Sequence, residues 1–166
     1  MATIPEQSIA ALLGLVSGLV GGYLSGRRQT KLDREKEARL AVAELARHLG
    51  AANHAMGWLT WKAANRPSHF QAEDLHNYDK EIHALFPAVT GAMAVVAAMS
   101  GRYYSLLKPL TKKTFAMDVE LANAGTRYLD SPGDGLKDLS ALLHPVVTFN
   151  SELNSRVTEI MDTGRR

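Results

Sequence analysis

Two kinds of apolar pattern divide this chain: an unbroken apolar run near its beginning and periodic apolar positions after it. Residues 9–26 (IAALLGLVSGLVGGYLSG) contain no charged side chain, and Arg27 and Arg28 follow them directly. A run of this length that ends at basic residues is typical of a membrane-spanning helix. We therefore expect residues 1–30 to form a short tail and a transmembrane anchor, and residues 31–166 to form a separate helical domain.

Small residues recur at every fourth position of the apolar run. On a helix such residues lie on one face, where their lack of bulk lets two helix backbones approach closely. This small-residue strip consists of Ala10, Gly14, Gly18, Gly22 and Gly26. The pattern predicts packing against a transmembrane helix of a second copy or of a partner membrane protein. The alternative is a helix buried inside a water-soluble protein, because the run is near the lower length limit for a span.

Charged residues flank the apolar run unequally. Residues 1–7 contain no Lys or Arg, whereas Arg27, Arg28, Lys31 and Arg34 follow the run. By the positive-inside rule, this asymmetry predicts an amino terminus outside the membrane and a cytoplasmic carboxy-terminal domain. A secretory signal peptide has its basic residues before the apolar run, so we expect the anchor to remain uncleaved.

Beyond the charged residues 30–39, apolar positions alternate in steps of four and three. This spacing is typical of a helix in a bundle or a coiled coil. The resulting seam consists of Ala38, Val42, Leu45, Leu49, Ala52, Met56, Leu59 and Ala63. Later helices are expected from about residue 71 to 87, 111 to 129 and 136 to 161. The predicted fold is all-α: one transmembrane helix followed by an antiparallel bundle of about four helices.

Finer predictions concern prolines, loops and faces. Pro87, Pro109 and Pro145 are each expected to kink, interrupt or bend a helix. Residues 130–135 (DSPGDG) combine proline and glycine in a polar cluster and predict a loop. The inward-facing residues of the helix from residue 111 are expected to be Phe115, Val119, Ala122 and Leu129.

Two aromatic residues beside this seam and one polar residue of the last predicted helix leave more than one interpretation. Trp58 and Trp61 lie one turn apart, and we expect them to cap the bundle core rather than to form a binding platform or rest on a membrane. Asn150 either fixes the register of the last helix or meets water at the bundle edge.

A second uncharged stretch, residues 84–101 (ALFPAVTGAMAVVAAMSG), is also long enough to span a membrane. Its alanine-rich composition and its lack of isoleucine favour a buried central helix of the bundle. A second transmembrane span remains the alternative.

Overall composition narrows the function only slightly. Hydrophobic residues make up 46% and charged residues 22% of the chain, which excludes a transporter with many spans. The net charge of +2 and the pI of about 8.9 are too small an excess of base to predict a nucleic-acid partner. The chain contains no cysteine, so disulfides and thiol chemistry are excluded.

One stripe of titratable residues is the weak candidate for a metal site. Glu73, His76, Asp79 and His83 are spaced to share one helix face, and imidazole and carboxylate can bind Zn, Fe or Mn. A di-iron bundle needs a second Glu-x-x-His copy, which the sequence lacks. An exposed helix face has the same composition. We therefore predict no cofactor and no enzymatic activity, with a helical-bundle metalloenzyme as an alternative.

Together these patterns predict a single-pass, membrane-anchored interaction or assembly module that oligomerises or docks on a partner through its small-residue strip. Its expected contacts are membrane lipid and another membrane helix. A membrane-active effector or channel subunit is a further alternative, in which Ser17 and Ser25 would line a polar path. The span contains no ionisable residue, which disfavours an ion pathway. No motif is specific enough to indicate a family.

Overall fold

The structure is a computed structural model that describes the backbone of residues 6–162 and the side chains of residues 30–162. Over this range the chain is helical and contains no strand, so the predicted all-α fold is confirmed. The helices are α1 (Glu6–Asn65), the 3₁₀ helix η1 (Pro67–His69), α2 (Ala72–Met99), α3 (Gly101–Asp130), α4 (Pro132–Ala141) and α5 (Leu143–Asp162). Two compact units are present, Met1–Glu37 and Ala38–Arg166.

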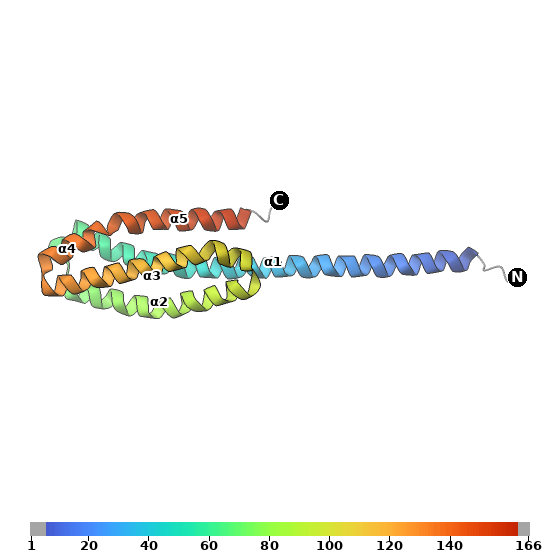
Figure 1. Cartoon of the computed structure of the whole chain (residues 1–166), viewed down its shortest axis with the longest axis horizontal. Helices are drawn as coiled ribbons and strands as arrows, with labels where there is room; N and C mark the ends of the chain where they lie inside the picture. The colour runs from blue at the N-terminus through green and yellow to red at the C-terminus, as the bar shows by residue number, and fades with distance from the viewer. Residues whose placement is uncertain (1–5, 163–166) are drawn as a thin grey trace. The chain divides into compact units, whose positions relative to one another are not determined.

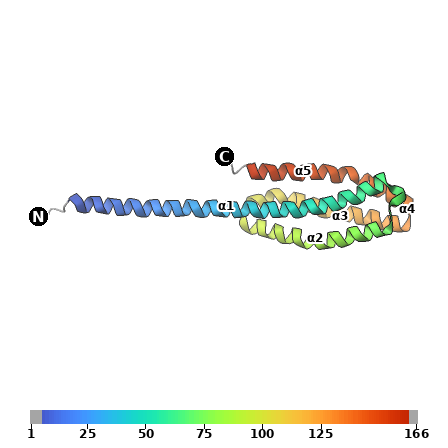
Figure 2. The same ribbon diagram turned by 180° about the vertical axis from the view of Figure 1, so that it is seen from behind.

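The unit Ala38–Arg166 is an antiparallel helical bundle (Figure 1). Its part of α1, then α2, then α3 run in alternating directions, and α4 followed by α5 makes the fourth pass. Single residues, Ser100 and Ser131, connect α2 to α3 and α3 to α4. Connections this short make consecutive helices antiparallel neighbours. Figure 2 shows the same order from behind, with α2 and α5 on opposite sides of the bundle.

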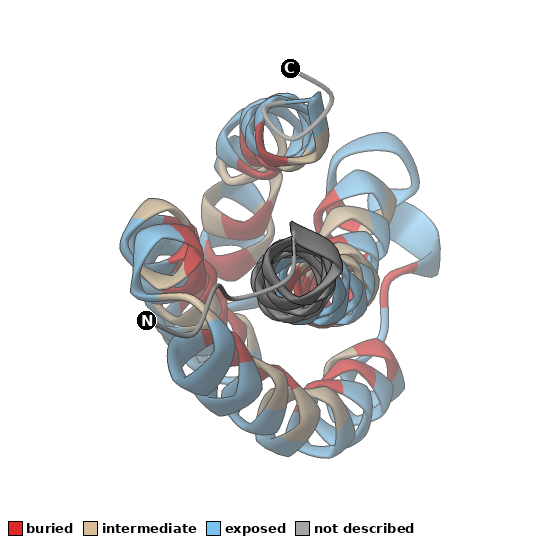
Figure 3. Cartoon of the chain, turned by 90° about the vertical axis from the view of Figure 1, so that its right-hand side faces the viewer, coloured by how far each residue is buried: buried red, intermediate tan, exposed pale blue. Residues whose placement is uncertain are grey.

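The core of the bundle forms around one face of α1. In an end-on view, buried residues face the inside of the bundle and exposed residues face outward (Figure 3). The seam residues of α1 are all buried: Ala38, Val42, Leu45, Leu49, Ala52, Met56, Leu59 and Ala63. They share one apolar cluster with Leu107 and Leu121 of α3 and with Phe149 and Leu153 of α5. Burying a leucine stabilises the fold by about 1.5–3 kcal/mol, so this seam outweighs local helix propensity.

The predicted interruption at Pro109 is wrong, because this proline lies inside α3, and α2 likewise continues through Pro87 without restarting. Both prolines are on the exposed side of their helices. A carbonyl that loses its amide partner there can bond to water instead, so each helix continues past its proline.

The predicted inner face of α3 is also largely wrong. Val119, Ala122 and Leu129 are exposed, and Phe115 is half-buried against Phe86 of α2, with ring centroids 4.4 Å apart. The helix begins at Gly101 rather than near residue 111. Its buried residues are Tyr103, Leu107, Leu110, Thr111, Thr114, Met117, Leu121, Ala124 and Gly125.

The last predicted helix is two helices. α4 ends at Ala141 and α5 begins at Leu143. The helix is therefore interrupted at Leu142, shortly before Pro145, and the predicted bend at Pro145 is wrong. Pro145 lies in the first turn of α5, where backbone amides have no acceptor within the helix, so its lack of an amide hydrogen costs no helical hydrogen bond. The predicted loop at residues 130–135 reduces to Ser131, because Pro132 occupies the first turn of α4, a position that favours proline.

α2 is the one helix, among residues with described side chains, that is long and apolar enough to cross a membrane by length and composition. It packs on α3, but between residues 84 and 99 only Val89, Met93 and Val96 are buried. This segment therefore belongs to the bundle, and the expectation that it forms a buried central helix is wrong. The predicted anchor at residues 9–26 is helical in its backbone, and its side chains lie outside the described residues.

A glycine at the α3–α4 corner provides a test of this packing. A Cβ atom at Gly135 would overlap the backbone of Tyr128, whereas one at Gly133, in the same helix, would meet nothing within 4 Å. We expect Gly135→Ala to lower the free energy of unfolding by about 1–3 kcal/mol, because the corner must open. Gly133→Ala should raise it by up to about 1 kcal/mol through helix propensity. Urea denaturation followed by circular dichroism measures both; equal effects would contradict the packing at this corner.

Candidate functional site

A groove between α1 and α5 is the candidate binding site of the bundle. Its volume is about 520 Å³. Its lining residues are Gly50, Asn53, His54, Gly57, Trp58, Trp61, Leu143, Val146, Val147 and Asn150. The two helices approach closely at Gly57, where an added Cβ atom would lie 3.7 Å from Cγ1 of Val146. Gly50 and Gly57 therefore leave space on this face of α1 that larger side chains would fill.

Both tryptophans of the chain lie on the rim of this groove. Trp58 is 47% exposed and Trp61 is 42% exposed, so the expectation that they cap the core is wrong. Leu59 occupies the seam position, which turns its neighbour Trp58 outward. Lys62 Nζ lies 5.1 Å from the ring centroid of Trp58, and Arg66 Cζ lies 5.6 Å from that of Trp61. Cations so placed are attracted to the ring faces.

Asn53 is a buried polar residue among the apolar residues of the groove. It is 4% exposed, and its Oδ1 atom has no hydrogen-bond donor among the described residues. An unpaired acceptor in an apolar setting lowers stability and favours any molecule that brings a donor to it. Sequence reasoning missed Asn53, because its burial depends on how the helices pack and not on the apolar spacing of α1. Asn150 is exposed at the rim, the edge position that was one of its two interpretations.

The candidate metal residues do not converge on a common site. Glu73, His76, Asp79 and His83 are all exposed on α2. His83 Nδ1 lies 3.3 Å from Asp79 Oδ1 and 3.0 Å from the Asp79 carbonyl oxygen, so this imidazole pairs within its own helix. Within residues 30–162, no group of three His, Asp or Glu side chains is placed to hold a metal ion.

The buried acid at the start of α2 is Asp74, which ties α1 to α2. Its Oδ1 accepts a hydrogen bond of 2.6 Å from Lys62 Nζ, and its Oδ2 accepts one of 2.8 Å from the backbone amide of Gln71. The second bond belongs to a capping box, a common start of a helix. Asp74 is therefore a structural residue.

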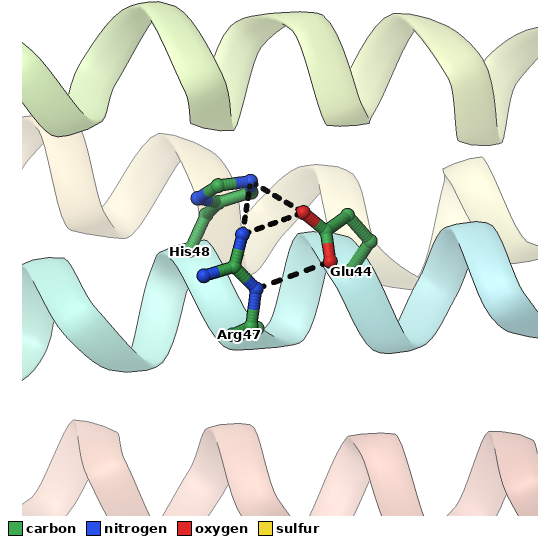
Figure 4. A network of polar contacts seen from close by, with 3 residues as sticks. All are labelled: Glu44, Arg47 and His48. Carbon is green, nitrogen blue, oxygen red and sulfur yellow. Dashed lines mark hydrogen bonds and ion pairs between the residues drawn. The ribbon is translucent and has the colours of Figure 1, made fainter.

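A polar network on α1 joins Glu44, Arg47 and His48 (Figure 4). Arg47 donates to both carboxylate oxygens of Glu44, at 2.6 and 3.1 Å, and His48 Nε2 lies 3.0 Å from Glu44 Oε1. The hydrogen bond from Arg47 lowers the pKa of Glu44, and the same contact raises the pKa of Arg47. Glu44 and Arg47 are exposed to water, where such pairs contribute little to stability.

The remaining predicted site residues all lie on α1. Lys31 and Arg34 are exposed. The side chains of the small-residue strip and of Arg27 and Arg28 lie outside the described residues. The following seam residues are buried in the bundle core: Val42, Leu45, Leu49, Met56 and Leu59.

Comparison with known proteins gives no match: no family model, no curated protein and no solved structure resembles the chain significantly. The residues of the chain itself are therefore the basis for a functional assignment.

Tyr78 links α2 to α3 through a hydrogen bond from its buried phenol. Its hydroxyl donates a hydrogen bond of 2.7 Å to Asp118 Oδ1. Burial, and then this hydrogen bond, raise the pKa of Tyr78 far above its ordinary value of 10.0. Because the pKa is raised in the folded state, the contribution of Tyr78 to the free energy of unfolding is complete below pH 10. It is lost as the pH rises further, because the phenol of the unfolded chain ionises first.

We expect Tyr78→Phe to lower the free energy of unfolding by about 0.5–1.5 kcal/mol at neutral pH. The difference between wild type and variant should shrink above about pH 10, where the unfolded phenol ionises. Urea denaturation over a pH series measures this difference. A difference that stays constant at alkaline pH would mean that Tyr78 is not protected from ionisation by the fold.

Replacing Asn53 tests whether its Oδ1 atom is unpaired. Asn53→Leu should raise the free energy of unfolding by about 1 kcal/mol, because an unpaired buried acceptor is removed. Thr60→Val is the matched control: Thr60 is also buried on α1, but its hydroxyl donates a hydrogen bond of 2.9 Å to the Met56 carbonyl. This control should give no gain in stability. Loss of stability in Asn53→Leu, measured by urea denaturation, would show that Oδ1 has a partner.

Proposed function

We propose that the chain is a single-pass, membrane-anchored assembly module that binds a second copy or a partner membrane protein through its small-residue strip. The observation that carries the proposal is the spacing of that strip within an uncharged run bounded by basic residues: Ala10, Gly14, Gly18, Gly22 and Gly26. Apolar side chains gain nothing by leaving lipid for another helix. Close backbone contact along small residues supplies the attraction instead.

Two features of the structure support this proposal. The backbone of residues 6–29 is helical, so the four-residue spacing places the small residues on one helix face. In the bundle, the seam of α1 is already covered by α3 and α5, so this face is not available to bind a partner. The strip therefore remains the face of α1 suited to assembly.

The bundle would then be the part that the anchor holds at the membrane. Arg27, Arg28, Lys31 and Arg34 follow the uncharged run, so the bundle would lie on the cytoplasmic side with the amino terminus outside. The groove between α1 and α5, with Trp58 and Trp61 at its rim, offers a second contact surface. Recruitment to a membrane-bound assembly, without catalysis, is the mechanism that we propose.

The strip makes a direct prediction about assembly. Gly18→Ile should reduce crosslinked oligomers, or crosslinking to a partner, several-fold, because a branched side chain separates the two backbones. Val20→Ile is the matched control, since Val20 lies about 200° around the helix from Gly18. Amine-reactive crosslinking of isolated membranes measures the effect, because Lys31 and Lys36 are exposed near the strip in sequence.

Two results would count against the proposal. If Gly18→Ile and Val20→Ile crosslinked as well as the wild type, the strip would have no role in assembly. If the chain stayed in the supernatant after sedimentation of lysed cells without detergent, the anchor itself would be wrong.

A further inference from the structure

The hairpin formed by the second half of α2 and the first half of α3 carries an unusual charge pattern. Residues 82–117 contain no Asp or Glu, but they contain Arg102, Lys108, Lys112 and Lys113. Lys113 pairs with Glu152 of α5 at 2.6 Å. Arg102 and Lys112 are exposed and have no carboxylate partner among the described residues, and Lys108 Nζ lies 5.3 Å from the ring centroid of Tyr104. The hairpin is thus more basic than the chain as a whole.

The same hairpin exposes an apolar face. The most apolar window of α2 has only 22% of its residues buried. Near the end of the helix, Val95 is 47% exposed and Met99 is 48% exposed, while Val96 is buried against the core. A bundle helix in water normally has charged residues on its outer side, and α2 has none from residue 84 to its end. Exposed apolar side chains one turn apart on a helix face without charge indicate a contact site.

The hairpin lies at the end of the bundle where its part of α1 begins, opposite the end that carries α4 (Figures 1 and 2). The stretch from Arg28 to Ala38, the first residue of the bundle, spans at most about 36 Å in any conformation. A membrane that holds residues 9–26 would therefore keep this end of the bundle within reach of the lipid headgroups, with Ala38 at most about 36 Å from Arg28.

We infer that the hairpin docks on an anionic lipid surface, with Val95 and Met99 at the headgroup boundary and Arg102, Lys108 and Lys112 facing lipid phosphates. This inference rests on the proposed anchoring, which holds the hairpin at the membrane. Exposed apolar side chains flanked by basic residues are the chemistry of interfacial segments. A second copy fits less well, because a symmetric contact would place this acid-free surface against its own cations.

The absence of cysteine permits a direct test with single attachment points. Met99→Cys and the control Leu129→Cys, each in the full chain, receive the environment-sensitive fluorophore NBD. Leu129 is exposed near the opposite end of the bundle, at the end of α3. Both proteins are reconstituted into vesicles of phosphatidylcholine alone or mixed with phosphatidylglycerol, and flotation and NBD emission are read on the same sample.

We expect both proteins to float with the vesicles. Emission at position 99 should be several-fold brighter and blue-shifted in the anionic vesicles, weaker in phosphatidylcholine alone, and quenched by nitroxides near the headgroups. Position 129 should remain water-like. Arg102→Glu should remove most of the change at position 99, whereas Lys80→Glu, an equal charge change on α2 outside the hairpin, should not.

Four results would overturn the docking, and they separate it from the proposed anchor. Flotation with water-like emission at position 99 refutes the docking alone. Emission that is shifted equally in both vesicle types and resists lipid nitroxides means that protein covers the face. Stronger quenching by nitroxides at the acyl-chain ends means that α2 crosses the bilayer. Failure to float in either vesicle type refutes both the anchor and the docking.

Discussion

The burial of one face of α1 is the interaction on which the bundle depends. From Ala38 to Ala63 this face contacts an apolar cluster that includes residues of every other helix of the bundle. Alanines at several seam positions let the neighbouring helices come close, and Leu45, Leu49 and Leu59 fill the space between them. Because this face is used inside the unit, any partner must bind to surfaces that the core leaves open.

Periodicity predicted α1 well and α3 poorly, and the reason lies in buried threonines. No proline interrupts α1 within the bundle, and its seam positions are apolar throughout. In α3, Thr111 and Thr114 face the core, where their hydroxyls donate to the carbonyls of Leu107 and Leu110. A threonine satisfied in this way can be buried, but a search for apolar spacing passes over it. Apolar spacing alone therefore selects the outward-facing Val119 and Leu129 as the inner face.

The sequence predicted only some of the residues that line the groove between α1 and α5, because burial beside a seam depends on the packing of other helices. The sequence drew attention to Trp58, Trp61 and Asn150, but not to Asn53 or to the relation among them. Whether a residue beside a seam is buried depends on which side chain of another helix lies opposite, and this is tertiary information. The stripe of candidate metal ligands shows the same limit, because spacing on one helix aligned four candidate residues without a second helix to complete a site.

The adjacent residues Val95 and Val96 lie on different faces of α2 and have different surroundings. Val96 is buried in the core, while Val95 is about half exposed. From residue 84 to its end, α2 has no charged residue on either face. In a bundle surrounded only by water, the outer face would gain solubility from charged residues at no cost to packing. An apolar outer face next to cations that have no carboxylate partner in the described part of the chain is instead the composition that suits the boundary between water and lipid. The ambiguity of residues 84–101 in the sequence, between core helix and membrane segment, then has a physical origin: the two faces of α2 suit different surroundings.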